Sequence, residues 1–88
     1  MNETKRTLML VGVVTHYYAR PGAAVVRFIR NVPLKTHIYF HGKTTNFEED
    51  IDSLEYNRFP TDLAKMNHNV GVSVTERVRK GDRVYTFV

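Results

Sequence analysis

Four histidines and a run of acids are the side chains of this sequence that could bind a metal ion or transfer a proton. His37 and His41 would share one face of a strand, but at roughly 3.3 Å per residue they would stand about 13 Å apart. That separation is too long for two ligands of one zinc ion, each of which binds at about 2 Å. The sequence has no cysteine, so thiolate ligands and disulfides are excluded as well. We therefore expect no metal ion and no other cofactor.

The acidic run EEDID, residues 48–52, could supply a carboxylate pair for acid–base catalysis. Its crowding is more typical of the solvated outer face of a strand. Ser53 and Ser73 lack the Gly-x-Ser-x-Gly elbow that exposes a nucleophilic serine. His16 has two interpretations, a functional group or a structural side chain that binds a strand-end carbonyl or stacks on Tyr17. The sequence thus predicts a protein that is not an enzyme.

The length and composition indicate one small domain. A chain of 88 residues buries only about 60 to 65% of its unfolded surface, which supports a single hydrophobic core. No apolar stretch approaches the roughly 18 to 20 residues that span a bilayer, and the apolar run at residues 8–14 lacks a signal-peptide cleavage pattern. We expect a cytoplasmic protein that does not associate with membranes, with a flexible polar tail over residues 1–7 and one domain over residues 8–88.

Charge is sorted along the chain. Residues 1–44 carry seven Lys or Arg and one acid, residues 45–69 carry two and six, and residues 70–88 carry four and two. The net charge of +4 therefore conceals two basic ends and an acidic middle. Segregation of this kind favours association with a polyanion, because charges of one sign gathered together produce a stronger local potential.

Apolar and β-branched residues alternate with a period of two, which predicts strands near residues 8–17, 23–29 and 37–41. The period fails in FEEDIDSLEY, where a bulge near residues 52–53 would restore it. PTDLAKM, residues 60–66, has the start signals of a single helical turn. Short strands separated by turn signals predict a small closed barrel or sandwich of about six strands.

The chain closes with two predicted strands, VGVSV and RVYTFV, joined around the sequence RKGD. We expect these strands to form a hairpin. Gly81 can adopt the left-handed backbone conformation that such a turn needs, because glycine has no Cβ. The basic loop before it would then be a solvated hairpin turn.

Three motifs follow one another along the chain: Gly12-x-Val14-Thr15-His16-Tyr17, Gly42-x-Thr44-Thr45-x-Phe47, and Val70-Gly71-x-x-Val74 with Glu76-Arg77-Val78-Arg79-x-Gly81-Asp82 after it. In this order they resemble the second domain of translation elongation factors, stand-alone translation elongation factor-like proteins, and the C-terminal barrel of U32 peptidase-type proteins. The resemblance covers about residues 10–88 and implies an all-β fold, a small six-stranded closed β-barrel. The chain departs from it at Lys35-Thr36, where such domains have a Gly-Asp turn, and at Asn67, where they have a glycine; asparagine is the next best residue for a positive φ.

The resemblance implies a link to RNA or to the translation apparatus. In elongation factors this domain packs on the GTPase domain and contacts tRNA and the ribosome, and the U32-type proteins include enzymes that act on ribosomal or transfer RNA. The chain itself has no Gly-x-x-x-x-Gly-Lys-Ser/Thr loop, so we expect no nucleotide cofactor. We expect a non-enzymatic accessory binding module whose first candidate partner is RNA, either tRNA or rRNA.

The first candidate surface is basic and aromatic and would bind RNA. Its cations come from the first and last loops, which would lie close together in a barrel whose terminal strands pair, and its tyrosines could stack on unpaired bases. In the competing interpretation the tyrosines belong to the core and the arginines keep strand edges soluble. The candidate residues are Tyr17, Tyr18, Arg20, Arg77, Arg79, Lys80 and Arg83.

The second candidate surface would dock a protein. The acidic segment 48–62 contains the apolar side chains Leu54, Tyr56 and Phe59. An apolar patch rimmed by charge is typical of a protein–protein contact. By the resemblance, this surface would be the counterpart of the face that elongation-factor barrels turn toward a GTPase domain. The alternative function is therefore a docking module for a separate U32-type or GTPase partner.

Overall fold

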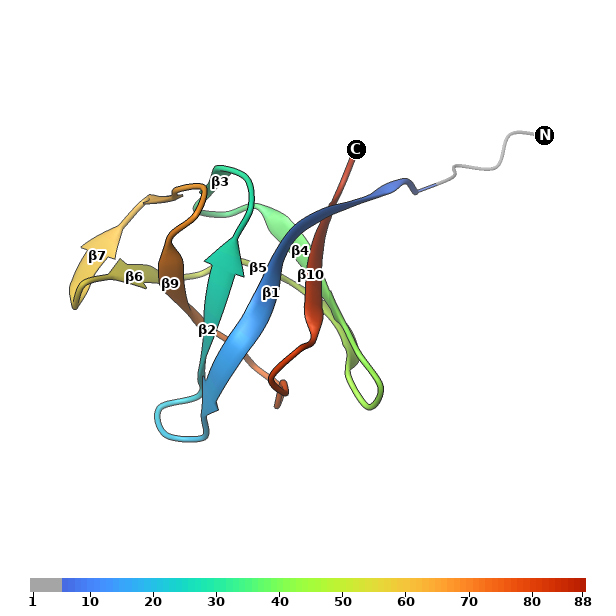
Figure 1. Ribbon diagram of the computed structural model, residues 1–88, viewed down its shortest axis with the longest axis horizontal. Helices are drawn as coiled ribbons and strands as arrows, with labels where there is room; N and C mark the ends of the chain where they lie inside the picture. The colour runs from blue at the N-terminus through green and yellow to red at the C-terminus, as the bar shows by residue number, and fades with distance from the viewer. Residues whose placement is uncertain (1–5) are drawn as a thin grey trace.

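The computed structural model describes residues 6–88, so residues 1–5 of the predicted tail lie outside the described residues. The described chain is built from strands without a helix (Figure 1). The all-β prediction is therefore confirmed. The strands are β1 (Leu8–Tyr18), β2 (Ala23–Phe28), β3 (Val32–Pro33), β4 (His37–His41), β5 (Asn46–Asp50), β6 (Leu54–Tyr56), β7 (Phe59–Thr61), β8 (Leu63–Ala64), β9 (Asn69–Ser73) and β10 (Arg83–Phe87).

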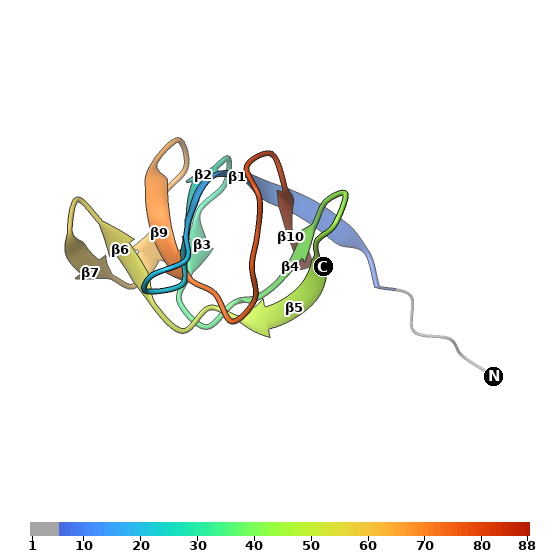
Figure 2. The same ribbon diagram turned by 90° about the horizontal axis from the view of Figure 1, so that it is seen from below.

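Eight strands form one antiparallel sheet in the order β5-β4-β10-β1-β2-β9-β6-β7, and β3 pairs with β8 in a separate ribbon. The strands surround a common interior (Figure 2). β2 shows how the sequence produces this curled layer, because Ala24, Val26 and Phe28 are buried while Arg27 points to solvent. The largest fully buried side chains are Phe28, Phe40, Ile38, Ile51, Val11, Val14, Val26, Val70, Val72, Val78 and Val84.

The sheet is not closed, which corrects the prediction of a six-stranded closed barrel. β5 and β7 are the two ends of the strand order. The chain itself crosses from one end toward the other at residues 51–53, between β5 and β6. Ile51 and Leu54 are both buried, and residues three apart cannot face the same side of one continuous strand. The strand therefore ends and a new one begins, where we had expected a bulge.

The side chain of Glu49 spans the opening that remains between β5 and the segment after β9. Its Oε1 accepts hydrogen bonds from the backbone N of Thr75 at 3.0 Å and from the Thr75 hydroxyl at 2.6 Å. A hollow of about 320 Å³ lies beside this link, lined by Glu49, Asp50, Asp52, Ser73, Val74 and Thr75. A side-chain bridge thus replaces the backbone hydrogen bonds that a closed barrel would have here.

The last two strands do not form the predicted hairpin. β9 pairs with β2 and β6, whereas β10 pairs with β1 and β4. Residues 74–82 therefore form a crossover loop, which is anchored by Val78, with 1% of its surface exposed. Gly81 has the predicted positive φ, 93°. A period-two pattern identifies strands but carries no information on which strands pair. The sequence therefore could not distinguish a hairpin of the last two strands from this crossover loop.

The predicted helical turn at residues 60–66 is also wrong, because β7 and β8 occupy that segment. β6 and β7 pair as a hairpin, with Tyr56 opposite Phe59. The two residues of its turn, Asn57 and Arg58, have φ values of 51° and 70°. Two consecutive positive φ values are typical of the tight turns that join antiparallel strands. An arginine in the place of the usual glycine concealed this turn in the sequence.

Lys35 and Asn67 both adopt a positive φ, 74° and 69°. These are positions at which the resembled domains carry Gly or a Gly-Asp turn. The prediction for Asn67 is confirmed. At Lys35 the chain keeps the conformation without glycine, and the backbone is held by hydrogen bonds of 2.9 Å from Lys35 N to the carbonyl O of Ile51 and from Ile51 N to the carbonyl O of Thr36.

Candidate functional site

The tyrosines of the predicted RNA surface have different environments. Tyr17 is half-buried and packs against the core, whereas Tyr18 is 52% exposed at the end of β1. The Tyr18 ring stacks on His16, with ring centroids 6.2 Å apart and ring planes 10° apart. His16 therefore makes an aromatic contact, with Tyr18 and not with Tyr17. One tyrosine of the pair, Tyr18, remains accessible for stacking.

The first and last loops do lie side by side, as the sequence predicts. The terminal strands β1 and β10 pair, and the backbone N of Val74 donates to the carbonyl O of Gly22 at 3.0 Å. Arg20, Arg77 and Lys80 are exposed in these loops. Their role in RNA binding stays a prediction.

The other two predicted cations point elsewhere. Arg79 is exposed, and its Nε donates to the Thr44 hydroxyl at 2.9 Å, which links the crossover loop to the β4–β5 turn. Arg83 lies on β10, where its neighbours in register are His41 on β4 and Val13 on β1. Arg83 thus belongs to the outer face of the sheet and not to the loop.

The predicted docking residues divide between the core and the surface. Leu54 is 2% exposed and belongs to the core, so its side chain is not part of a docking surface. Tyr56 is half-buried, and its ring stacks on His68 with centroids 4.3 Å apart. Phe59 is 72% exposed. The β6–β7 hairpin that carries Phe59 projects from one end of the molecule (Figure 1).

The outer edge of the hairpin cannot easily accept another strand. β7 ends the strand order of the sheet, and its middle residue is Pro60, opposite Glu55. Proline has no backbone N–H to donate and commonly blunts edge strands. A partner would therefore contact the hairpin through side chains, above all Phe59.

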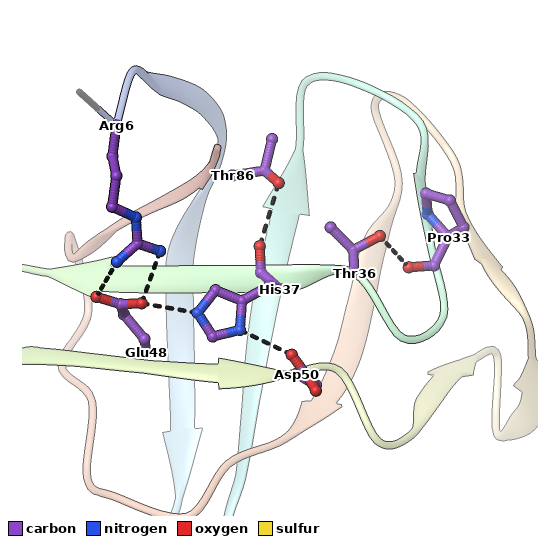
Figure 3. Close-up of polar contacts among 7 residues, drawn as sticks. All are labelled: Arg6, Pro33, Thr36, His37, Glu48, Asp50 and Thr86. Atoms are coloured by element: carbon purple, nitrogen blue, oxygen red, sulfur yellow. Dashed lines mark hydrogen bonds and ion pairs between the residues drawn. The ribbon is translucent and has the colours of Figure 1, made fainter. Parts of the chain in front are cut away.

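A polar network on β4 and β5, which we did not predict from the sequence, holds the segment before β1 (Figure 3). His37 lies between two carboxylates, with Nε2 2.7 Å from Glu48 Oε1 and Nδ1 2.7 Å from Asp50 Oδ1. Glu48 also binds the Arg6 guanidinium through two contacts of 2.9 and 3.2 Å. Arg6 in turn lies over the Phe87 ring, 3.7 Å from its centroid, as expected for a cation–π contact.

The network favours the charged form of His37, because only the imidazolium can donate from both ring nitrogens. Hydrogen bonds to Glu48 first, and then to Asp50, raise the pKa of His37 above 6.5. The hydrogen bond from His37, followed by that from Arg6, lowers the pKa of Glu48. His37 thereby links β4 to β5. In this charged form both ring nitrogens already carry a proton, so the side chain cannot act as a base toward a substrate.

The acidic run EEDID forms a solvated outer face, as the sequence predicts. Glu48 and Asp50 point to solvent, while Ile51 is buried. Across residues 6–88, no three metal-ligating side chains gather into a possible ion site. Over the same residues, no helix has the length and apolar character needed to cross a membrane.

Comparison with known proteins identifies the fold. No protein-family model matches the chain. Two crystal structures of the C-terminal domain of a U32 peptidase of Geobacillus thermoleovorans, one of them a selenomethionine variant, match with TM-scores of 0.80. They are 19% and 18% identical and cover 86% and 90% of this chain and 96% and 91% of their own. The chain therefore has the fold of a U32 peptidase C-terminal domain.

A curated relative is similar to nearly the whole of this chain. An uncharacterized protease of Methanocaldococcus jannaschii is 32% identical to the chain over 85 residues, which are 96% of this chain. The match takes in 21% of the protease, so the chain spans about a fifth of the length of this relative. The U32 part of the predicted resemblance is thus confirmed at the level of fold, while the elongation-factor part stays a prediction.

Proposed function

We propose that this chain is a docking module without catalytic activity of its own, which binds a U32-type peptidase through the β6–β7 hairpin. The observation that carries the proposal is Phe59, which is 72% exposed at the end of the sheet. The likeness in fold to a U32 peptidase C-terminal domain supports the choice of partner. The Methanocaldococcus jannaschii protease adds support, because a segment similar to this chain there forms about a fifth of a larger protein.

The hairpin has the properties of a preformed anchor. Burying the exposed part of a phenylalanine ring contributes about 2 kcal/mol. Phe59 is the first residue of β7 and directly follows a tight turn. Pro60 restricts the backbone that comes next. Because the tight turn and Pro60 restrict the backbone, less conformational entropy is lost on binding than with a flexible loop.

The charge around the hairpin indicates what the partner surface carries. Glu55, which pairs with Pro60, and Asp62, which follows β7, are exposed and outnumber Arg58, the cation of the turn. A basic rim around an apolar pocket would complement this surface, since opposite potentials speed association and exclude wrong partners. We therefore expect the peptidase to offer a pocket for Phe59 bordered by Lys or Arg.

Isothermal titration of the chain with a U32-type peptidase from the same genome tests the proposal. We expect Phe59→Ala to weaken binding on the order of tenfold, as the loss of a central aromatic anchor does. The double variant Arg77→Glu/Arg79→Glu, on the crossover loop, is the matched control and should bind as the unmodified chain does. Equal affinity for the Phe59→Ala variant, or loss of binding only in the charge-reversal control, would contradict the proposal.

A further inference from the structure

The outer face of β4, β10 and β1 presents side chains in rows that cross the strands. Tyr85 on β10 is paired in register with Tyr39 on β4 and with Leu10 on β1. Side chains at paired positions of neighbouring strands point to the same side of a sheet. Tyr39, Tyr85 and Leu10 therefore form one row on the surface that faces away from the core.

The aromatic rings on this face lie side by side. The Tyr39 ring centroid lies 6.0 Å from that of Tyr85, 6.4 Å from that of Phe87 and 5.7 Å from that of His41. Tyr39, Tyr85 and Phe87 are all partly exposed, and none of them is among the side chains that pack on the core. Core packing thus does not account for three neighbouring aromatic residues here.

A polar and cationic row follows the aromatic row toward the other end of the strands. Arg83 on β10 is flanked in register by His41 and Val13, and Val13 is flanked in turn by Arg27 on β2. Both arginines are exposed. Rings beside guanidinium groups combine a stacking surface with a binding surface for phosphate.

The two acids that border this face, Glu48 and Asp50, already have partners. Glu48 is bound by Arg6 and His37, and Asp50 is bound by His37. These contacts hold the two carboxylates to Arg6 and His37, and Arg83 and Arg27 are the exposed cations that could attract an anion. One Arg27 nitrogen, Nη1, also donates to the carbonyl O of Asn67 at 3.4 Å. The face is suited to a ligand that carries both flat rings and negative charge.

We propose that this outer face binds single-stranded nucleic acid, with bases stacked on Tyr39 and Tyr85 and the phosphate backbone along Arg83 and Arg27. A duplex fits less well, because its bases are stacked on one another and cannot reach the rings. Of the residues that the sequence had suggested for RNA binding, Arg83 alone belongs to this face. The proposal is independent of the docking function, because the β6–β7 hairpin occupies the far end of the strand order.

Fluorescence anisotropy with labelled oligouridylate and oligothymidylate of about twelve nucleotides tests this proposal, with a duplex of the same length as the third ligand. We expect both single strands to bind more tightly than the duplex, and Tyr39→Ala to lower affinity on the order of tenfold. Raising the salt concentration from about 50 to about 200 mM should weaken binding about sevenfold if two phosphates are contacted. Similar affinity for oligouridylate and oligothymidylate, or a preference for oligouridylate, agrees with the proposal, since the bases and phosphates that the face would bind are present in both.

The control variants locate the binding surface. Arg83→Glu should weaken binding at least as much as Tyr39→Ala, whereas Arg58→Glu in the β6–β7 turn should leave it unchanged. If the circular dichroism spectrum shows that Tyr39→Ala is unfolded, Tyr39→Leu takes its place in the experiment. Leucine keeps the apolar bulk of the side chain but has no aromatic face. No binding of either single strand at about 50 mM salt would overturn the proposal, and so would binding that is lost in Arg77→Glu but retained in the Tyr39 and Arg83 variants.

Discussion

The β6–β7 hairpin and the outer face of β4, β10 and β1 both expose aromatic side chains, but they do so in opposite ways. The hairpin presents one isolated ring, Phe59, on a strand whose edge is blunted by proline. The outer face presents three rings, with Tyr39 next to both Tyr85 and Phe87, beside guanidinium groups. An isolated ring needs a pocket in a partner to bury it, whereas neighbouring rings form a flat surface that needs no pocket.

The surroundings of an exposed ring, more than the ring itself, therefore indicate the kind of ligand that it binds. Phe59 lies on a hairpin where the exposed acids Glu55 and Asp62 outnumber Arg58, which favours a basic protein surface. Tyr85 shares its face with Arg83, and Glu48, the acid paired in register with Tyr39, is bound by Arg6 and His37, which favours a polyanion with stackable bases. The two surfaces should therefore respond independently to substitution.

The substitution with the largest expected effect disturbs the support of the outer face. A Cβ added at Gly42, directly after β4, would overlap Oδ1 of Asp82, a side chain that is 5% exposed. Because Asp82 also accepts a hydrogen bond from the backbone N of Arg79 at 2.8 Å, it cannot move freely. We expect Gly42→Ala to lower the free energy of unfolding by about 3 kcal/mol, measured by urea denaturation.

Gly71→Ala is the matched control near the hairpin. The added Cβ would approach the carbonyl O of Glu55 at 3.6 Å, an ordinary contact. The free energy of unfolding should change by less than about 1 kcal/mol. A similar loss of stability at both glycines would contradict the view that the β4–β5 corner, and not the hairpin side, is the tightly packed support.

The next largest effect on stability distinguishes a ring of the outer face, Tyr85, from the exposed ring of the hairpin, Phe59. Tyr85→Ala removes a partly buried side chain with its ring contact to Tyr39, and we expect a loss of about 1 to 2 kcal/mol in unfolding free energy. Phe59→Ala should change the same quantity by no more than about 0.5 kcal/mol, because its side chain is largely exposed in the free chain. Thermal denaturation of both variants checks this order, and the reverse order would show that Phe59 serves the fold.

The smallest effect is the dependence of stability on pH. The pKa of His37 is raised in the folded chain by Glu48 and Asp50, so its contribution is fully present below pH 6.5 and is lost as the pH rises through the folded value. The side chain is 44% exposed, and we expect this contribution to be no more than about 0.5 kcal/mol. Melting temperatures at about pH 6 and pH 9, for the unmodified chain and for His37→Gln, measure it.

The sign of the His37 effect distinguishes the network from ordinary titration of the surface. The unmodified chain should lose stability between the two pH values, and His37→Gln should lose less. An equal decrease in both proteins would show that the imidazolium does not hold the Arg6 segment and β5 together.

The sequence was sufficient for the longer strands, such as β1, β2 and β4, because period-two alternation follows directly from strand geometry. The short strands β7 and β8 were mistaken for a helical turn. The sequence also placed the positive φ values of Asn67 and Gly81, which the structure confirms. Strand pairing was not predictable in the same way, because the residues of β9 and β10 would fit a hairpin as well as a crossover. The break at residues 51–53 had a signal in the spacing of Ile51 and Leu54, but a bulge and a strand break leave the same signal.

The candidate surfaces were predicted in part. Phe59 was recognisable as an apolar residue in an acidic segment, while Leu54, which has the same sequence surroundings, is buried. The outer face was missed because its members are split between β4 and β10, more than 40 residues apart along the chain. HIYFH and RVYTF each place polar or aromatic residues at alternate positions, and only the pairing of the two strands reveals that they form one surface.

The most direct test of separate surfaces is to titrate three proteins with two ligands: the unmodified chain, Phe59→Ala and Arg83→Glu, each with the U32-type peptidase and with oligouridylate. We predict that Phe59→Ala weakens binding of the peptidase alone and that Arg83→Glu weakens binding of the oligonucleotide alone. Loss of both ligands through a single substitution, in a variant that remains folded, would contradict the account.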